Sequence, residues 1–132
     1  MCRFVIRILP VILVMNVAAC GQNKEEHPSS GIISSTLENL ARESLPGAKL
    51  AHEKCGTCHY MDRNISKVGP PLKGIVGRAP SISGVPFKKW DEKSLGQWLK
   101  DPTGIKPSTL MAIPGIKSEK ERTEIIEYLK QF

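Results

Sequence analysis

The sequence predicts an all-α protein with three main short helices and long loops. Near the C-terminus, Ile125, Tyr128, Leu129 and Phe132 recur at helical spacing and would form one apolar face. Residues 60–90, in contrast, are interrupted by glycine and proline and cannot form a long regular element. No alternating or continuous apolar run indicates a strand. Because short helices with long loops make a poor core, a large apolar ligand at the centre would complete it.

The first 19 residues have the pattern of a secretory signal. Arg3 and Arg7 precede an apolar run over residues 8–19, which has about half the length that a membrane-spanning helix requires. The run leads into the sequence VAAC, which resembles the lipobox of bacterial lipoproteins and would be cut before Cys20, the lipidated residue. An uncleaved anchor and a signal cut elsewhere are the alternatives. All three place the folded part of the chain outside the cytoplasm.

The rest of the chain divides into a tether and a domain. Residues 20–46 are polar and punctuated by proline and glycine, so we predict a lipidated Cys20 followed by a flexible tether. A short helix over residues 36–44 remains open, because apolar residues there share a face. The predicted organisation is a signal peptide over residues 1–19, the tether over 20–46 and one domain over 47–132.

Three helices are predicted within the domain. The first covers residues 47–55. Asp91 is a suitable N-cap for the second, which would run through Leu99. The third would start at a capping box formed by Ser118 and Glu121.

A CGTCH motif begins at Cys55. Two cysteines at this spacing suit half of a zinc site, a redox dithiol or the two anchors of a covalent haem. Zinc takes four ligands, yet beyond Cys55, Cys58 and His59 the only other histidines are His27 and His52, both upstream. A redox dithiol expects a βαβ framework, and the chain shows no strand pattern. The motif therefore favours one covalent haem c, with His59 as an iron ligand.

A second iron ligand would have to come from the opposite side of the haem. His52 lies on the same helix as the cysteines, and Met61 follows His59 by two residues, so neither reaches that side. Met111 lies in a proline-bounded loop between two helices, which can wrap around it. The alternative is that Met111 is a core-filling side chain.

With these residues in place, the chain resembles a class I monohaem cytochrome c of the mitochondrial-like group, in a lipoprotein-anchored bacterial form. The resemblance covers nearly all of residues 47–132. It implies the small cytochrome c fold, with three main short helices and long loops wrapped around one covalent haem. The matching positions are Gly47, Gly69, Pro70, Leu72, Gly77, Arg78, Trp90, Leu95, Trp98, Leu99, Pro102, Pro107, Met111, Tyr128 and Leu129.

The resemblance also implies roles for residues around the haem. The Pro70 carbonyl would accept a hydrogen bond from the His59 ring. Arg78 and the Trp90 indole would bind a haem propionate, unless Arg78 is only a solvated loop residue. Trp98 would pack beside the haem on the Met111 side.

One departure from the family pattern concerns the crossing of the first and last helices. Gly47 would let these helices approach closely. Ala51 stands where the family has an aromatic residue, so Leu50 or Phe132 would have to fill the crossing.

His and Met ligands leave iron without a vacant site, which predicts an electron-transfer protein and not an enzyme. We expect a single-electron carrier that shuttles between membrane respiratory complexes on the outer, periplasmic face of a bacterial membrane. The loop around Met111 supplies no general base. The alternatives are a haem-based peroxidase or gas sensor with a labile Met ligand, and a fixed haem subunit of a larger oxidoreductase complex.

The charge of the domain indicates its partners. Residues 47–132 contain 15 Lys and Arg and nine Asp and Glu, an excess of six positive charges. We expect acidic redox partners, such as a cytochrome bc complex and a terminal oxidase or reductase, and no nucleic acid. The lysines expected at the rim of the haem edge are Lys54, Lys67, Lys73, Lys88, Lys89 and Lys106.

Overall fold

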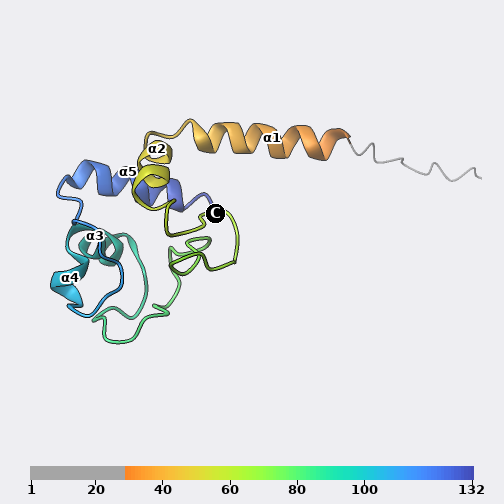
Figure 1. The fold of residues 1–132 in the computed structure, drawn as a ribbon. Helices are drawn as coiled ribbons and strands as arrows, with labels where there is room; N and C mark the ends of the chain where they lie inside the picture. The colour runs from red at the N-terminus through yellow and green to blue at the C-terminus, as the bar shows by residue number, and fades with distance from the viewer. Residues whose placement is uncertain (1–28) are drawn as a thin grey trace, which may run out of the picture.

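The computed structural model describes residues 29–132 as an all-α fold, which confirms the predicted class (Figure 1). A compact group of helices and loops carries one helix that projects from it. None of the helices between residues 29 and 132 combines the length and the apolar character needed to cross a bilayer. The helices are α1 (Ser29–Glu43), α2 (Pro46–Lys54), α3 (Glu92–Lys100), α4 (Pro102–Ile105) and α5 (Glu119–Leu129).

Helices α2 and α5 cross in close contact, as the resemblance implied. A Cβ at Gly47 would overlap the Glu124 carbonyl and lie 2.9 Å from the Ile125 nitrogen, so only glycine permits this approach. Ala51 is fully buried in the core. Leu50 and Phe132, the two residues expected to fill the space, are both half-buried against the core.

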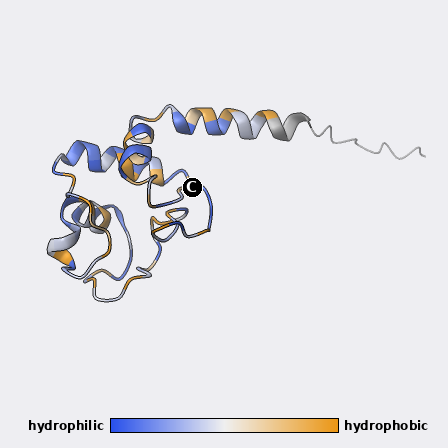
Figure 2. Cartoon of the chain, viewed as in Figure 1, coloured by the Kyte–Doolittle hydropathy of each residue, from blue (hydrophilic) through white to orange (hydrophobic). Residues whose placement is uncertain are grey.

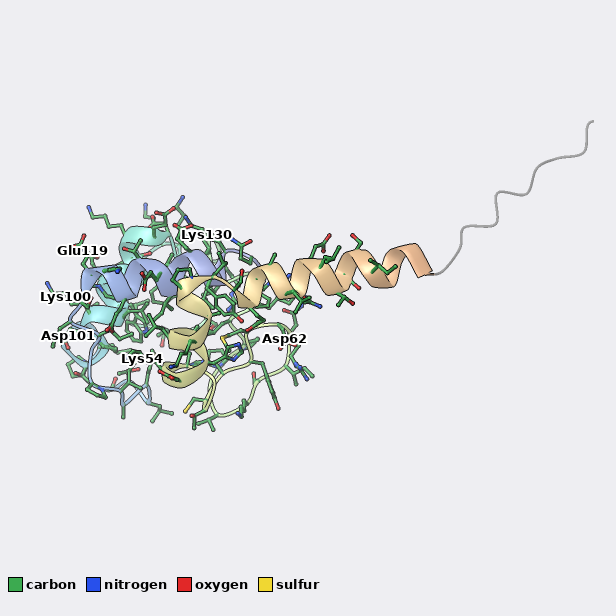
Figure 3. All side chains as sticks on the ribbon, turned by 90° about the horizontal axis from the view of Figure 1, so that it is seen from above. Lys54, Asp62, Lys100, Asp101, Glu119 and Lys130 are labelled. Carbon is green, nitrogen blue, oxygen red and sulfur yellow. The ribbon has the colours of Figure 1, made fainter. Side chains whose placement is uncertain are left out.

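Helix α3 begins with a complete capping box. Asp91 Oδ1 accepts the Ser94 N–H at 2.9 Å, and Ser94 Oγ accepts the Asp91 N–H at 2.8 Å. The helix ends at Lys100, which Asp101 follows (Figure 3). Asp101 then caps the four-residue α4 by accepting the Gly104 N–H at 2.9 Å. The sequence predicted only a stop at this point. An aspartate before a proline can also start a helical turn, because the aspartate side chain supplies the N-cap and the proline fixes φ at the first helical position.

Helix α5 is predicted correctly, but its capping box is only half formed. Ser118 Oγ accepts the Glu121 N–H at 3.3 Å, whereas the Glu121 carboxylate lies 3.7 Å from Lys54 Nζ on α2. Of the predicted apolar face, Ile125, Tyr128 and Leu129 are buried, and Phe132 is half-buried. Ile126 is buried as well, because α5 packs against both α2 and α3.

The long loop over residues 60–90 is held by backbone hydrogen bonds. The Cys58 carbonyl accepts the Gly69 N–H at 2.8 Å. Further on, the Trp90 carbonyl accepts the Gly77 N–H at 2.7 Å, and the Trp90 N–H donates to the Arg78 carbonyl at 2.8 Å. Gly77 has φ +89°, which an L side chain rarely adopts. The loop is therefore irregular, as predicted, yet tied at both ends.

The prediction of a flexible tether is wrong for residues 29–43, which form helix α1. The short helix left open over residues 36–44 lies almost wholly within α1, which begins earlier, at Ser29. The sequence interpretation gave weight to the glycine and prolines around this segment, but no proline lies between Ser29 and Glu43. Contacts with the domain hold the end of the helix, because Glu43 accepts a hydrogen bond from the Tyr128 hydroxyl at 2.8 Å and lies 2.9 Å from His52 Nε2. The predicted signal peptide, Cys20 and His27 lie outside the described residues.

Candidate haem site

Cys55, Cys58 and His59 lie together on one turn at the end of α2. The Cys55 N–H donates to the Ala51 carbonyl at 2.8 Å, and the Cys58 and His59 N–H groups donate to the Cys55 carbonyl at 3.0 and 2.9 Å. Burial raises the pKa of the Cys55 thiol to about 11, so it is protonated at neutral pH. This environment is opposite to the one that activates a redox dithiol, which lowers a thiol pKa.

The His59 ring has the orientation that the resemblance implied. Its Nδ1 lies 2.6 Å from the Pro70 carbonyl oxygen. Because a carbonyl can only accept, Nδ1 carries the proton and Nε2 keeps its lone pair for a metal. The backbone at Gly69 passes directly against the imidazole, and a Cβ there would lie 2.7 Å from Nδ1. Glycine at this position therefore allows the loop to reach His59.

Met111 is held by a tryptophan on another element. The Trp98 indole N–H on α3 donates to Met111 Sδ at 3.0 Å, and the Met111 N–H donates to Thr109 Oγ1 at 3.2 Å. Met111 is half-buried, whereas the preceding Leu110 side chain is fully exposed. Met61, the other methionine of the domain, is buried in the core.

Arg78 and Trp90 lie on two neighbouring backbone segments. The Arg78 guanidinium donates to the carbonyls of Pro71 at 2.7 Å and Lys73 at 3.3 Å, so Arg78 is not merely a solvated loop residue. Its Nε is buried and has no hydrogen-bond partner among residues 29–132. Trp90 is buried, with its ring centroid 5.6 Å from that of Trp98.

These residues fit a covalent haem. Two thiols and an imidazole with a free Nε2 lie on one turn, and the unpartnered Arg78 Nε suits a carboxylate such as a propionate. When bound, haem supplies an iron that exchanges one electron. The two candidate iron ligands are oriented by separate contacts, His59 by Pro70 and Met111 by Trp98.

The lysines predicted at the haem rim differ in their surroundings. Lys54 is near Glu121, and Lys67 Nζ donates to the Gly56 carbonyl at 2.8 Å. Lys88 and Lys89 are exposed, whereas Lys73 and Lys106 are half-buried, so these side chains are not equally available to a partner.

Sequence reasoning missed several contacts at the site. No local pattern indicates the Trp98–Met111 hydrogen bond, because the two residues are 13 positions apart on different elements. The contact between Gly69 and His59 follows from the backbone path of the loop. Tyr128 was expected only on the apolar face of α5, yet its hydroxyl bonds Glu43.

The all-α fold of residues 29–132, the CGTCH turn and a histidine oriented by Pro70 are the features of a small protein that holds a covalent haem. Comparison with known proteins gives the family. The cytochrome c family model matches residues 44–132, so the chain belongs to the cytochrome c family and is a class I monohaem member. Proteins of this family bind haem c covalently and transfer electrons without acting as enzymes.

Individual relatives agree with this assignment. The chain is 33% identical over 93 residues to cytochrome c of Euglena viridis, which covers 64% of this chain and 91% of that protein. It is 35% identical over 98 residues to cytochrome c of Theileria parva, and this match covers 67% of this chain and 85% of that protein. Among solved structures, cytochrome cH from Methylobacterium extorquens matches with a TM-score of 0.55 and 34% identity, over 67% of this chain and 98% of that one.

Proposed function

We propose that this protein is a single-electron carrier in which His59 and Met111 are the two axial ligands of one haem covalently attached to Cys55 and Cys58. The observation that carries the proposal is that residues remote in sequence orient both candidate ligands. Pro70 fixes the His59 ring, and Trp98 donates to the Met111 sulfur. Two oriented ligands favour a closed coordination sphere, which suits electron transfer and leaves no site for substrate.

The hydrogen bond from Trp98 has two effects on Met111. It holds the thioether in one place, which limits rearrangement when the charge of the centre changes. It also draws electron density from the sulfur, which favours the reduced form of the centre. On the other side, the Pro70 carbonyl holds His59 in the tautomer that leaves Nε2 free.

Arg78 and Trp90 are the candidate propionate-binding residues. The buried Nε of Arg78 has no acceptor among residues 29–132, and a propionate would provide one. The paired backbones of Gly77, Arg78 and Trp90 hold these side chains on neighbouring segments.

The proposed location is the outer, periplasmic face of a bacterial membrane, where lipidated Cys20 anchors the protein. The VAAC sequence and the preceding apolar run support this proposal. Anchoring would keep the carrier near membrane respiratory complexes and raise its effective concentration there. The positive domain suits acidic partners, such as a cytochrome bc complex and a terminal oxidase or reductase.

Carbon monoxide binding tests the proposed carrier. The haem-loaded protein should titrate reversibly with one electron, and its reduced spectrum should stay unchanged after carbon monoxide is added. Carbon monoxide binding within the mixing time would show an open or labile ligand position and would support a gas sensor or peroxidase instead.

Replacement of Cys20 tests the anchor separately. The Cys20→Ala variant is expressed in cells that still remove its signal peptide. The variant should then move from the membrane fraction to the soluble fraction. Retention of the variant in the membrane fraction with its signal removed would show that lipid on Cys20 is not the anchor.

A further inference from the structure

Helix α1 presents its apolar side away from the domain. Ile33, Leu37 and Leu40 are 61%, 61% and 63% exposed and follow one another at spacings of four and three residues. This spacing places them on one side of the helix, where these three residues form the apolar stripe of α1. Figure 2 shows hydrophobic positions recurring along α1, in a helix that projects from the rest of the protein.

At its C-terminal end, α1 meets the domain through polar side chains. Asn39, Arg42 and Glu43 line a cavity of about 410 Å³ that is also lined by His52 and Tyr128. Globular proteins normally bury the apolar side of a surface helix. Because α1 projects from the domain and contacts it only at its C-terminal end, the apolar stripe stays exposed and available for something outside the domain.

Specific contacts hold α1 in this orientation. Glu43 bonds both the Tyr128 hydroxyl, at 2.8 Å, and His52 Nε2, at 2.9 Å, and thereby connects α1 to α5 and α2. The Arg42 guanidinium lies 4.4 Å from the centre of the Phe132 ring. These contacts fix the last turn of α1, so whatever the stripe binds also sets the orientation of the domain.

We propose that the apolar stripe of α1 lies on a lipid bilayer. This inference rests on the proposed membrane anchoring, because only eight residues, 21–28, separate Cys20 from the first residue of α1. Fully extended, eight residues span at most roughly 29 Å. The helix itself is roughly 22 Å long, so a chain anchored at Cys20 keeps the whole stripe within reach of the membrane surface.

A second copy of the chain is a weaker candidate for the occupant. A stable coiled coil needs apolar positions sustained over three or four heptads, whereas the stripe from Ile33 to Leu40 spans a single heptad. A bilayer surface needs only a short amphipathic helix with one apolar side and one polar side, which α1 provides.

The charge of α1 shows which force would hold it on the membrane. Between residues 33 and 43 the helix carries Glu38 and Glu43 against Arg42, so it is not a basic helix that requires anionic lipid. Binding should therefore depend on burial of apolar surface and should occur on zwitterionic phosphatidylcholine.

The test is photo-crosslinking of the full-length, haem-loaded protein on phosphatidylcholine vesicles. One sample carries p-benzoylphenylalanine in place of Leu37, within the stripe, and a matched sample carries it in place of Glu38, about 100° around the helix. Adducts to phospholipid are measured by mass spectrometry. We expect about fivefold more lipid adduct from position 37 than from position 38, since only the stripe enters the lipid.

Flotation of the vesicles in the same samples measures anchoring, and the visible spectrum measures the haem. Three results with floating protein would overturn the proposal: equal lipid adduct from both positions, no lipid adduct, or adducts between two protein chains. Each of these results would leave the anchor and the carrier intact. Protein that neither floats nor forms lipid adducts would contradict both the stripe and the anchor.

Discussion

The indole N–H of Trp98 lies 3.0 Å from the sulfur of Met111, although the two residues belong to different elements and are 13 positions apart. This hydrogen bond predicts the effect of Trp98→Phe on the reduction potential. A neutral hydrogen bond contributes about 0.5–1.5 kcal/mol, so loss of this donor should lower the one-electron midpoint potential by about 20–60 mV. Potentiometric titration of the haem-loaded protein measures this shift.

Trp98→Tyr is the control for lost packing, because it keeps a donor on a buried aromatic ring. The tyrosine variant should retain part of the potential that the phenylalanine variant loses. Equal potentials in the wild type and Trp98→Phe would show that the hydrogen bond has no influence on the centre.

Gly69→Ala should disturb His59. The added Cβ would lie 2.7 Å from His59 Nδ1, so the ring must move away from the Pro70 carbonyl. We expect a loss of about 2 kcal/mol or more in the free energy of unfolding, because a close contact becomes overpacked. Chemical denaturation of the haem-loaded protein measures it.

Gly96→Ala provides the matched glycine control. Nothing lies within 4 Å of the Cβ that this substitution adds on α3. Alanine is the better helix former by about 1 kcal/mol, so this variant should be as stable as the wild type or more stable. Similar destabilisation by both substitutions would contradict a specific role for Gly69.

Asp91 gives the stability a defined dependence on acid. The Ser94 backbone and side-chain hydrogen bonds hold the pKa of Asp91 below its ordinary value. Its stabilising effect is therefore complete above the unfolded pKa of about 3.9 and is lost as the pH falls through the lower folded pKa.

Asp91→Asn should retain a cap for α3 but lose this part of the acid dependence. Unfolding measured between neutral pH and about pH 2 should show a shallower decline for the variant than for the wild type. Parallel curves for the two proteins would exclude Asp91 as a source of the acid sensitivity.

Tyr128→Phe should loosen α1 without unfolding the domain. The substitution removes the hydroxyl that donates to Glu43 and keeps the buried ring. We expect faster amide hydrogen exchange in the last turn of α1 and a loss of about 1 kcal/mol in the free energy of unfolding. Tyr60→Phe is the control, and a similar change in α1 exchange there would argue against the Glu43 contact.

The well-predicted parts of this protein depend on neighbours in sequence. Asp91 and Ser94 cap α3 from three residues apart, and Ser118 caps α5 in the same way. Local pattern alone was therefore enough to place both helices. The CGTCH turn is equally local, since the Cys55 carbonyl accepts hydrogen bonds from the backbone N–H groups of Cys58 and His59.

The parts that sequence reasoning missed depend on distant partners. Helix α1 is held by Tyr128, which lies 85 positions from Glu43, and no local pattern indicates that bond. The polar composition and the proline and glycine of residues 20–46 favoured a tether, and the local pattern left a helix open only over residues 36–44. Likewise, the capping box at Ser118 is only half formed because the Glu121 carboxylate lies beside Lys54 of α2.

The proposed carrier depends on Met111 as the second axial ligand of the haem. The most direct measurement is the methionine–iron charge-transfer band in the optical spectrum of the oxidised, haem-loaded protein. We predict this band in the wild type and in Met61→Leu, since Met61 is buried in the core, and its loss in Met111→Ala. Absence of the band from the wild type, or its persistence in Met111→Ala, would contradict ligation by Met111.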